Sequence, residues 1–395
     1  MKVLHIIFTT TGYKVSGAVS AALSIAQELN RLVDTKVLIM SDKNQKKTYK
    51  SLEVIELKSS SGLFDFIPIP ERIRKLFLKA NVEKYILAEK PDIVHFHNPI
   101  PTLAVLKAAR FCKINGIKYV MTSHGFNEMF NFSKSFKVNF LFSFVVTFLV
   151  HYPLKYVLKN AEILFLLSPN ELEDVKKYLK VGTINYAITP NGYPVDVKIS
   201  SLQKETCRFR FLFETEKPTI FYLGNHTQNK GLDVLIKSVE LLKYECTVII
   251  GGKTKIKGGK HEFMGKDLSS LSKNIYFTGF LEDHEKFYLL ANCNFLVHPT
   301  RADTLPLSII EAMYFEKAVV STTVGGIPSL VDADTGVLVP AGDAIALANA
   351  IDCVLSEPGN AIKMGVNGRK KVLSKFSWEK SALHTFEAYK KAVRI

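Results

Sequence analysis

The stretch 218–239, PTIFYLGNHTQNKGLDVLIKSV, contains the unit from which the chain is built. An apolar run at 218–224 is followed by a polar loop that ends in glycine, and then by an amphipathic segment at 231–242. A continuous apolar run of this length is typical of a strand buried on both faces, and the segment after it has the period of a helix. The stretch therefore predicts a β-strand, a loop and an α-helix.

The same alternation continues along both halves of the chain. We expect strands at residues 3–8, 36–40, 92–97, 118–124 and 162–168, and again at 218–224, 246–252, 274–279, 293–299 and 317–322. Helical patterns lie between them, at Ser20–Leu32, Arg72–Leu87, Thr102–Ile114, Gly231–Leu242, Glu282–Leu290, Leu307–Phe315 and Asp343–Leu355. Buried strands that alternate with helices form parallel sheets covered on both faces. With 395 residues, the pattern predicts an α/β protein of two doubly wound domains that join near 193–206.

The basic charge is concentrated in the first half of the chain. Residues 1–200 contain 27 Lys and Arg against 16 Asp and Glu, whereas residues 201–395 contain 25 against 21. A surplus of cations indicates an anionic partner, either a membrane surface, a phosphorylated substrate or a nucleic acid. The five cysteines are scattered without metal-binding spacing, which fits a reducing cytoplasm. No cleavage-site pattern follows the first apolar run, so we expect it to form a strand and not a signal peptide.

The segment 138–150, VNFLFSFVVTFLV, has no charged residue. As a helix it would cover roughly 20 Å, which is short of a hydrocarbon core about 30 Å thick. Asn139, Ser143 and Thr147 recur every four residues and give the helix a narrow polar stripe. Two interpretations remain open: a helix buried inside the first domain, or a helix that lies in a bilayer interface.

Ligands of open α/β sheets bind at the carboxyl ends of the strands, where several candidate residues follow. Gly17 precedes a helix and would let backbone N–H groups approach an anion, although a plain turn explains it equally well. His124 ends a strand before Gly125, a position that favours contact with a substrate. His95 and His97 share one face of their strand, but no third ligand has suitable spacing, so packing explains them better than a metal site. No GxGxxG pattern follows the first strand, which argues against a nicotinamide cofactor.

The segment 301–313, RADTLPLSIIEAM, carries an acid at each end of a loop-to-helix turn. Asp303 should lie on the loop and Glu311 about two turns along a helix that begins just after Pro306, a residue suited to helix starts. The loop N–H groups would face a diphosphate, and the acids would accept hydrogen bonds from hydroxyl groups on either side. Lys230 would place a point charge on phosphate oxygens; the alternative is a solvated lysine. These features indicate a nucleotide-sugar site.

Several segments match, in order and spacing, the motifs of a known family. In 303–331 two acids enclose seven residues and the sequence VGGIP follows. The other matching segments are SGA at 16–18, TSHG at 122–125, TPNGYPVD at 189–196, GNHTQNKG at 224–231 and the terminal FSWEKSALHTFEAYKKAV at 376–393. Over nearly its whole length, the chain thus resembles the retaining glycosyltransferases of family 4, among them bacterial surface-polysaccharide and lipopolysaccharide enzymes.

The resemblance implies the GT-B fold, with two facing Rossmann-like domains and a cleft between them. Residues 1–197 would form the acceptor-side domain, and the terminal helix 376–395 would pack back on it. Residues 198–375 would form the domain that binds the nucleotide-sugar donor.

The family's functional residues map onto this chain one by one. Glu311 would hold the ribose hydroxyls and Asp303 the hydroxyls of the donor sugar. Lys230 would hold the diphosphate, and His124 would lie near the transferred sugar. The resemblance therefore implies Asp303, His124 and Lys230 as the catalytic residues.

The remaining donor-binding residues belong to loops at strand ends. Those expected near the diphosphate are Gly17, Thr304, Leu305, Pro306 and Leu307, and those expected to border the base are Gly252 and Gly279.

Two positions depart from the family's pattern. Asn225 stands in the donor-binding loop where the family usually has arginine, so the leaving diphosphate loses one expected cation. Arg301 and Lys253 are the candidates to replace it, because both lie on strand-end loops. Asp303 is one methylene shorter than the glutamate that is commoner in the family, so this position does not indicate which donor sugar binds.

The resemblance also implies a reaction. Fixed donors would stabilise the negative charge that develops on the departing phosphate. The acceptor would attack on the leaving-group face, so that the sugar keeps its configuration. No Asp-x-Asp motif stands at a strand end, so we expect a site without a metal and no cofactor besides the nucleotide sugar.

The basic first half and the 138–150 segment would bring the enzyme to the cytoplasmic face of an anionic membrane as a peripheral protein. We therefore expect a saccharide acceptor linked to a lipid diphosphate and no nucleic-acid partner. Two alternatives remain: a GT-B nucleotide-sugar epimerase, and a non-catalytic basic protein that binds membrane or nucleic acid.

Overall fold

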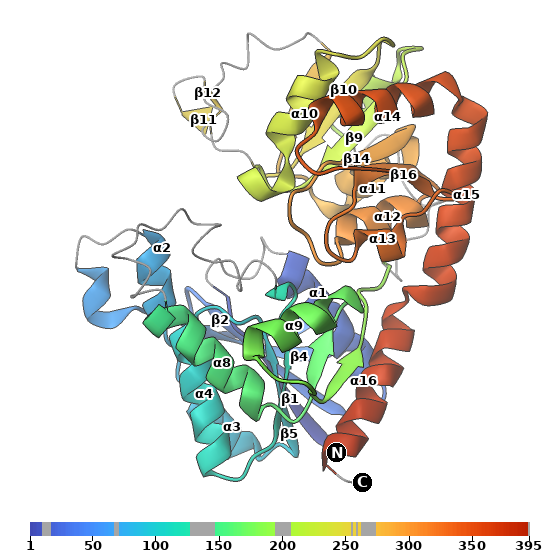
Figure 1. Cartoon of the computed structure of the whole chain (residues 1–395). Coiled ribbons are helices and arrows are strands. Elements are labelled where there is room, and N and C mark those ends of the chain that lie inside the picture. The colour runs from blue at the N-terminus through green and yellow to red at the C-terminus, as the bar shows by residue number, and fades with distance from the viewer. Residues whose placement is uncertain are drawn as a thin grey trace. The chain divides into compact units, whose positions relative to one another are not determined.

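The computed structural model describes residues 1–9, 17–66, 71–126, 147–193, 207–253, 256–257, 260–261 and 274–393. The chain forms two compact units (Figure 1). Unit 1 comprises Met1–Pro190 and Trp378–Ile395, and unit 2 comprises Asn191–Ser377.

Unit 1 is built on an eight-stranded sheet in the order β3-β4-β2-β1-β5-β6-β7-β8. All neighbouring strands are parallel except β3 and β4, which form an antiparallel pair. The strands are β1 (Lys2–Ile7), β2 (Asp34–Ser41), β3 (Gln45–Tyr49), β4 (Leu52–Lys58), β5 (Ile93–His97), β6 (Tyr119–Thr122), β7 (Leu164–Leu166) and β8 (Tyr186–Ile188). The helices are α1 (Gly17–Leu29), α2 (Glu71–Arg74), α3 (Val82–Glu89), α4 (Thr102–Ile114), α8 (Tyr152–Asn160), α9 (Asn170–Leu179) and α16 (Trp378–Val393).

Alternation along the strands divides the core of unit 1 between the two faces of the sheet. Leu4 and Ile6 of β1 belong to the core that the sheet shares with α3, α4, α8 and α9. Ile7, on the opposite face, packs with α1. The C-terminal helix α16 lies against α1 and β8, so the end of the chain covers the sheet formed by its beginning (Figure 1).

Unit 2 is a six-stranded parallel sheet in the order β13-β10-β9-β14-β15-β16. The strands are β9 (Thr219–Leu223), β10 (Thr247–Gly251), β13 (Ile275–Gly279), β14 (Phe295–His298), β15 (Ala318–Thr322) and β16 (Gly336–Val339). The helices are α10 (Leu232–Val239), α11 (Asp283–Asn292), α12 (Leu307–Tyr314), α13 (Ile327–Leu330), α14 (Ala344–Ser356) and α15 (Pro358–Lys375). Counted along unit 2, the order is 3-2-1-4-5-6, in which the winding reverses between β9 and β14. The predicted α/β class with two doubly wound parallel sheets is confirmed.

The prediction of one helix over Arg72–Leu87 is wrong. The segment contains α2, a short 3-10 turn at Lys75–Phe77, and α3. Between them Lys79 pairs with Ser60, since each backbone N–H donates to the other's carbonyl at 2.9–3.0 Å. This long-range bridge requires an extended backbone, which interrupts the helix.

The structure bears on only part of the 138–150 segment, because 138–146 lie outside the described residues. A π-helical turn at Thr147–His151 leads into α8. Val150 is buried in the core, whereas Phe148 is 65% exposed. Each described helix is too short or too polar to cross a bilayer.

Candidate functional site

The loops after β9 and β14 meet at the point where the winding of the unit 2 sheet reverses. The N–H of Arg301 donates to the carbonyl of Asn229 at 2.6 Å, and Thr300 Oγ1 donates to the same oxygen at 2.8 Å. Gly231, between Lys230 and α10, has a φ of 66°, and a Cβ there would lie 1.9 Å from the carbonyl oxygen of Pro299. Only glycine permits this approach, which brings Lys230 to the β14 loop.

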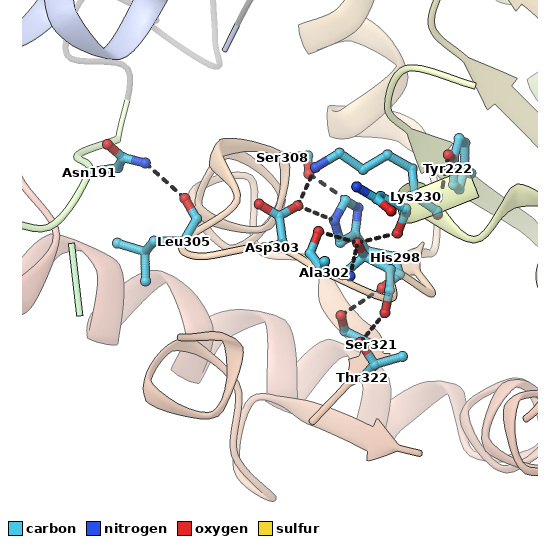
Figure 2. Close-up of polar contacts among 12 residues, drawn as sticks. Asn191, Tyr222, Lys230, His298, Ala302, Asp303, Leu305, Ser308, Ser321 and Thr322 are labelled. Atoms are coloured by element: carbon cyan, nitrogen blue, oxygen red, sulfur yellow. Dashed lines mark hydrogen bonds and ion pairs between the residues drawn. The ribbon is translucent and has the colours of Figure 1, made fainter. Parts of the chain in front are cut away.

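Lys230, Asp303 and His298 form a charged cluster at this junction (Figure 2). Lys230 Nζ donates to Asp303 Oδ2, and His298 Nε2 lies 3.2 Å from the same oxygen. Burial raises the pKa of Asp303, but Lys230 and His298 outweigh it and hold the pKa well below its usual range. The carboxylate is therefore ionised near neutral pH.

The ionised carboxylate also determines the state of His298. Burial lowers the pKa of His298, so the ring is neutral near pH 7. A carboxylate only accepts hydrogen bonds, so the proton of the ring lies on Nε2 and points at Asp303. Nδ1 is then an acceptor, and Ser308 Oγ lies 3.4 Å from it.

The backbone of the 300–305 loop is held from several sides (Figure 2). Thr322 Oγ1 donates to the carbonyl of Thr300 at 2.7 Å, and Asn191 Nδ2 donates to the carbonyl of Leu305 at 2.8 Å. The N–H of Gly326 donates to the carbonyl of Thr304 at 2.7 Å. A Cβ on the preceding Gly325 would lie 1.8 Å from the carbonyl oxygen of Asp303, so the VGGIP loop packs directly against the site.

Three carbonyl groups of this loop are thus engaged, whereas its amides before α12 are available. Across the described residues, the N–H groups of Thr304, Leu305 and Leu307 donate no hydrogen bond. Pro306, between them, has no N–H group to donate. Its contribution is a fixed φ of −68° at the N-cap of α12.

Glu311 lies on α12 and is paired with a lysine from α11. Lys286 Nζ donates to Glu311 Oε1 at 2.7 Å and lies 3.2 Å from Asp283 Oδ1. Burial lowers the pKa of Lys286, but the two acids outweigh it and raise the pKa above its ordinary value. Lys286 therefore stays charged and fixes one carboxylate oxygen of Glu311.

Glycines let the loops after the neighbouring strands approach closely. Gly252 has a φ of 136°, and a Cβ there would lie 1.9 Å from the carbonyl oxygen of Gly224. Its N–H donates to the carbonyl of Gly279 at 2.9 Å. The predicted residues Gly252 and Gly279 thus border the same edge of the sheet as Lys230.

The candidate cations differ in their surroundings. Arg301 makes a two-pronged ion pair with Asp233 of α10, with both N–O distances 2.7 Å, and it also donates to the carbonyl of Gln228. A guanidinium engaged in this way clamps the β14 loop to α10, which argues against its replacing the expected cation. Lys253 and Asn225 are both exposed on their loops.

The other two candidates lie in unit 1. Gly17 is the exposed first residue of α1, and His124 follows β6 with a φ of 55°. The structure therefore brings together Lys230, Asp303 and the Thr304–Leu307 loop within unit 2, and holds Gly17 and His124 in a separate unit.

Sequence reasoning missed four residues that hold these candidates in place: His298, Lys286, Asn191 and Gly325. Asn191 and Gly325 stand inside motifs that were recognised, and His298 ends an expected strand, so each had a signal. Lys286 lies in an ordinary amphipathic helix and had none.

Two family models match successive parts of the chain. Residues 15–197 match the model described as Glycosyltransferase Family 4, and residues 203–371 match Glycosyl transferases group 1. This chain belongs to the family 4 glycosyltransferases. The O-antigen chain mannosyltransferase C of Escherichia coli is 23% identical over 240 residues, which are 59% of this chain and 60% of the relative. The chain spans about half the length of the curated relatives it matches.

Solved structures share the fold of this glycosyltransferase over nearly its full length. Sucrose-phosphate synthase from Thermosynechococcus elongatus has a TM-score of 0.76 at 19% identity, covering 99% of both chains. Anabaena Alr3699/HepE, solved in complex with UDP, has a TM-score of 0.71 at 16% identity, covering 99% of this chain and 100% of that one. The fold is GT-B.

Proposed function

We propose that the chain is a retaining glycosyltransferase that moves a hexose-type sugar from a nucleotide diphosphate sugar to a saccharide acceptor in surface-polysaccharide biosynthesis. The observation that carries the proposal is the grouping of Lys230, Asp303 and three available amides at the reversal point of the unit 2 sheet. The name of the O-antigen relative supports the polysaccharide context, and the UDP complex of a structural neighbour supports the donor class.

The diphosphate would bind where positive charge and N–H donors converge. Lys230 supplies the cation, and the amides of Thr304, Leu305 and Leu307 supply hydrogen bonds to phosphate oxygens. These donors are fixed by the loop backbone, so they stabilise charge on the departing diphosphate without reorganising. No side chain needs to transfer a proton if a phosphate oxygen accepts the proton of the attacking hydroxyl.

The two acids would hold the ends of the donor. Asp303 stays ionised and is oriented by His298, so its second oxygen is an acceptor for sugar hydroxyls. Glu311 would accept from the ribose, and Lys286 leaves it one carboxylate oxygen for that contact. Because both carboxylates are held in place, the donor is bound with little loss of side-chain freedom.

The proposal is tested by incubating the full chain with UDP- and GDP-sugars and candidate acceptors. We expect acceptor-dependent release of nucleoside diphosphate and a product whose anomeric configuration matches the donor. A charge-assisted hydrogen bond contributes about 1.5–3 kcal/mol, so Lys230→Met should lower kcat/KM by about 10- to 150-fold. Lys237→Met, an exposed lysine on α10, is the matched control and should have no effect. An isomerised sugar nucleotide with no release would identify an epimerase instead.

We also propose that unit 1 docks on an anionic membrane surface that carries a lipid-diphosphate-linked acceptor. Phe148 and Tyr152 are 65% and 52% exposed, and their rings stack with centroids 6.3 Å apart. Arg110, on the adjoining α4, donates to the Tyr152 hydroxyl at 3.4 Å. Exposed aromatic rings beside a cation suit the interface of an anionic bilayer.

Flotation with vesicles tests the docking proposal separately. The chain should float with phosphatidylglycerol vesicles and not with phosphatidylcholine vesicles. Phe148→Ser with Tyr152→Ser should abolish flotation, whereas Ile362→Ser, which removes an exposed apolar residue of α15, should not. Equal flotation of the folded double variant would contradict the proposal.

A further inference from the structure

Unit 1 contains a group of histidines that the proposed function does not use. β1 and β5 are parallel neighbours in a register that pairs His5 with His95 and Ile7 with His97. The three histidines point to the same face of the sheet and are 0–1% exposed. They lie beside the point where the winding of the unit 1 sheet reverses, between β1 and β5.

The imidazoles of His5, His97 and His124 form a chain of hydrogen bonds. His5 Nδ1 lies 2.8 Å from His97 Nε2, and His97 Nδ1 lies 3.0 Å from His124 Nε2. The end nitrogens of the chain, His5 Nε2 and His124 Nδ1, are buried and have no hydrogen-bond partner among the described residues. The chain thus runs from the interior of the sheet to the loop after β6.

His95 is a separate neighbour of this chain. Its Nδ1 lies 2.5 Å from the hydroxyl of Tyr389 on α16, and its Nε2 lies 2.7 Å from Thr122 Oγ1. Both ring nitrogens of His95 are therefore already engaged.

His5, His95 and His97 offer ring nitrogens within 4.8 Å of one another, a spacing that also suits a metal ion. The orientation of the rings argues against one. An imidazole binds metal through a lone pair in its ring plane, and the rings of His95 and His97 are stacked with centroids 4.0 Å apart at 27°. Lone pairs of stacked rings do not converge, and a hydrogen-bonded network accounts for the geometry.

The number of protons limits the chain to two arrangements. Burial lowers the pKa of His5 to about 3 and that of His124 to about 4, and it holds that of His97 well below its ordinary value. Three neutral rings carry three N–H protons, of which two fill the hydrogen bonds between rings. The third lies at one end, on His5 Nε2 or on His124 Nδ1.

The two ends differ in what is able to accept that proton. His5 lies in the middle of β1, where an N–H would remain an orphan donor in the core. His124 lies at the carboxyl edge of the sheet, where substrates of this fold class bind. Its donor is satisfied as soon as an oxygen of the substrate reaches it.

We infer that His5 donates to His97 and His97 to His124, so that His124 presents Nδ1–H to a hydroxyl or phosphate oxygen of the substrate. His5 and His97 are positioning residues that act through the tautomer of His124. The inference deepens the proposed function and rests on it for the identity of the substrate. It also assigns His124 as a neutral donor, because Nδ1 in this tautomer has no lone pair with which to act as a base.

Nitrogen-15 NMR of the full chain, labelled at histidine, tests the tautomer directly. His124, identified by the signals lost in His124→Gln, should be neutral at pH 7 with the proton on Nδ1. A proton on Nε2 would reverse the chain and overturn the inference. Zinc that copurifies with the natural chain and is absent from His5→Leu would also overturn the inference. Neither result depends on activity, so a failure of the proposed function is distinguishable from a failure here.

Two substitutions of His97 separate the hydrogen bond from packing. His97→Asn keeps an N–H near the position of Nδ1, whereas His97→Leu fills similar space without a donor. We expect His97→Leu to free the tautomer of His124 and lower kcat about tenfold, and His97→Asn to preserve both within about threefold. Equal losses in the two variants, or loss of activity with the tautomer unchanged, would reduce the chain to a packing role. If neither variant folds, the spectrum of the natural chain decides.

Discussion

Mild acid should destabilise unit 1, because unit 1 holds four histidines, three of them buried and His124 half-buried, whose rings stay neutral in the folded chain. Their pKa values in the folded chain are about 3 for His5, about 4 for His124, and well below 6.5 for His95 and His97. In the unfolded chain each has an ordinary pKa near 6.5 and takes up a proton as the pH falls. The stability that they contribute is present above pH 6.5 and is lost below it.

The size of the effect follows from proton linkage. Between pH 7 and pH 5.5, one histidine that stays neutral only in the folded state costs slightly more than about 1 kcal/mol, and four cost about 5 kcal/mol. Glu171 acts in the opposite direction, since burial raises its pKa from 4.5 to about 7. It takes up a proton that the unfolded chain does not bind, so it offsets about 2 kcal/mol of the loss over the same interval. The net expected loss is about 3 kcal/mol.

Urea unfolding measures this loss in unit 1 specifically. The single tryptophan of the chain, Trp378, belongs to unit 1 and is buried, so its fluorescence reports the unfolding of that unit. His5→Gln should reduce the loss by about 1 kcal/mol, and Glu171→Gln should increase it. His384→Gln, at an exposed position of α16, should leave it unchanged. A free energy of unfolding that is the same at pH 7 and pH 5.5 would refute the reasoning.

Two further predictions concern unit 2. Lys286→Met should raise the donor KM because it frees the Glu311 carboxylate. In the double variant with Glu311→Gln, the loss in kcat/KM should be smaller than the sum of the losses in the two single variants. Additive losses would show that the two residues act independently. Gly325→Ala should lower the melting temperature by at least the equivalent of about 1 kcal/mol and raise the donor KM, because φ is 55° and its Cβ would press on the Asp303 carbonyl. Gly359→Ala, whose Cβ would meet nothing within 4 Å, is the control, and equal effects of the two alanines would contradict the proposed contact.

Local patterns in the sequence were sufficient for the elements that carry the site. The helix expected at Thr102–Ile114 has the same bounds in the structure, and the helix expected to begin at Leu307 begins there. Apolar periodicity and the chemistry of helix starts act over a few residues, so they are readable without the fold. The strands β3, β4, β8 and β16 are among those that were missed. Runs such as GVLV at 336–339 are too short to stand out, and in β4 the apolar run is interrupted by Glu53 and Glu56.

The partners of the site residues required the tertiary structure. Lys230 and Asp303 were expected at one site, but the contacts that His298, Lys286 and Asn191 make with the site residues were found only in the structure. Arg301, expected as a spare cation, is committed to Asp233, 68 residues away in the chain.

The sequence by itself determined where strands alternate with helices, which residues end the strands, and which family the motifs resemble. Only the tertiary structure decided which side chains meet. The His5–His97–His124 chain joins two strands and the loop after a third, and its first two members are 92 positions apart in the sequence. Such contacts depend on strand order and register, which arise from packing of the whole sheet and leave no periodic signal in the residues themselves.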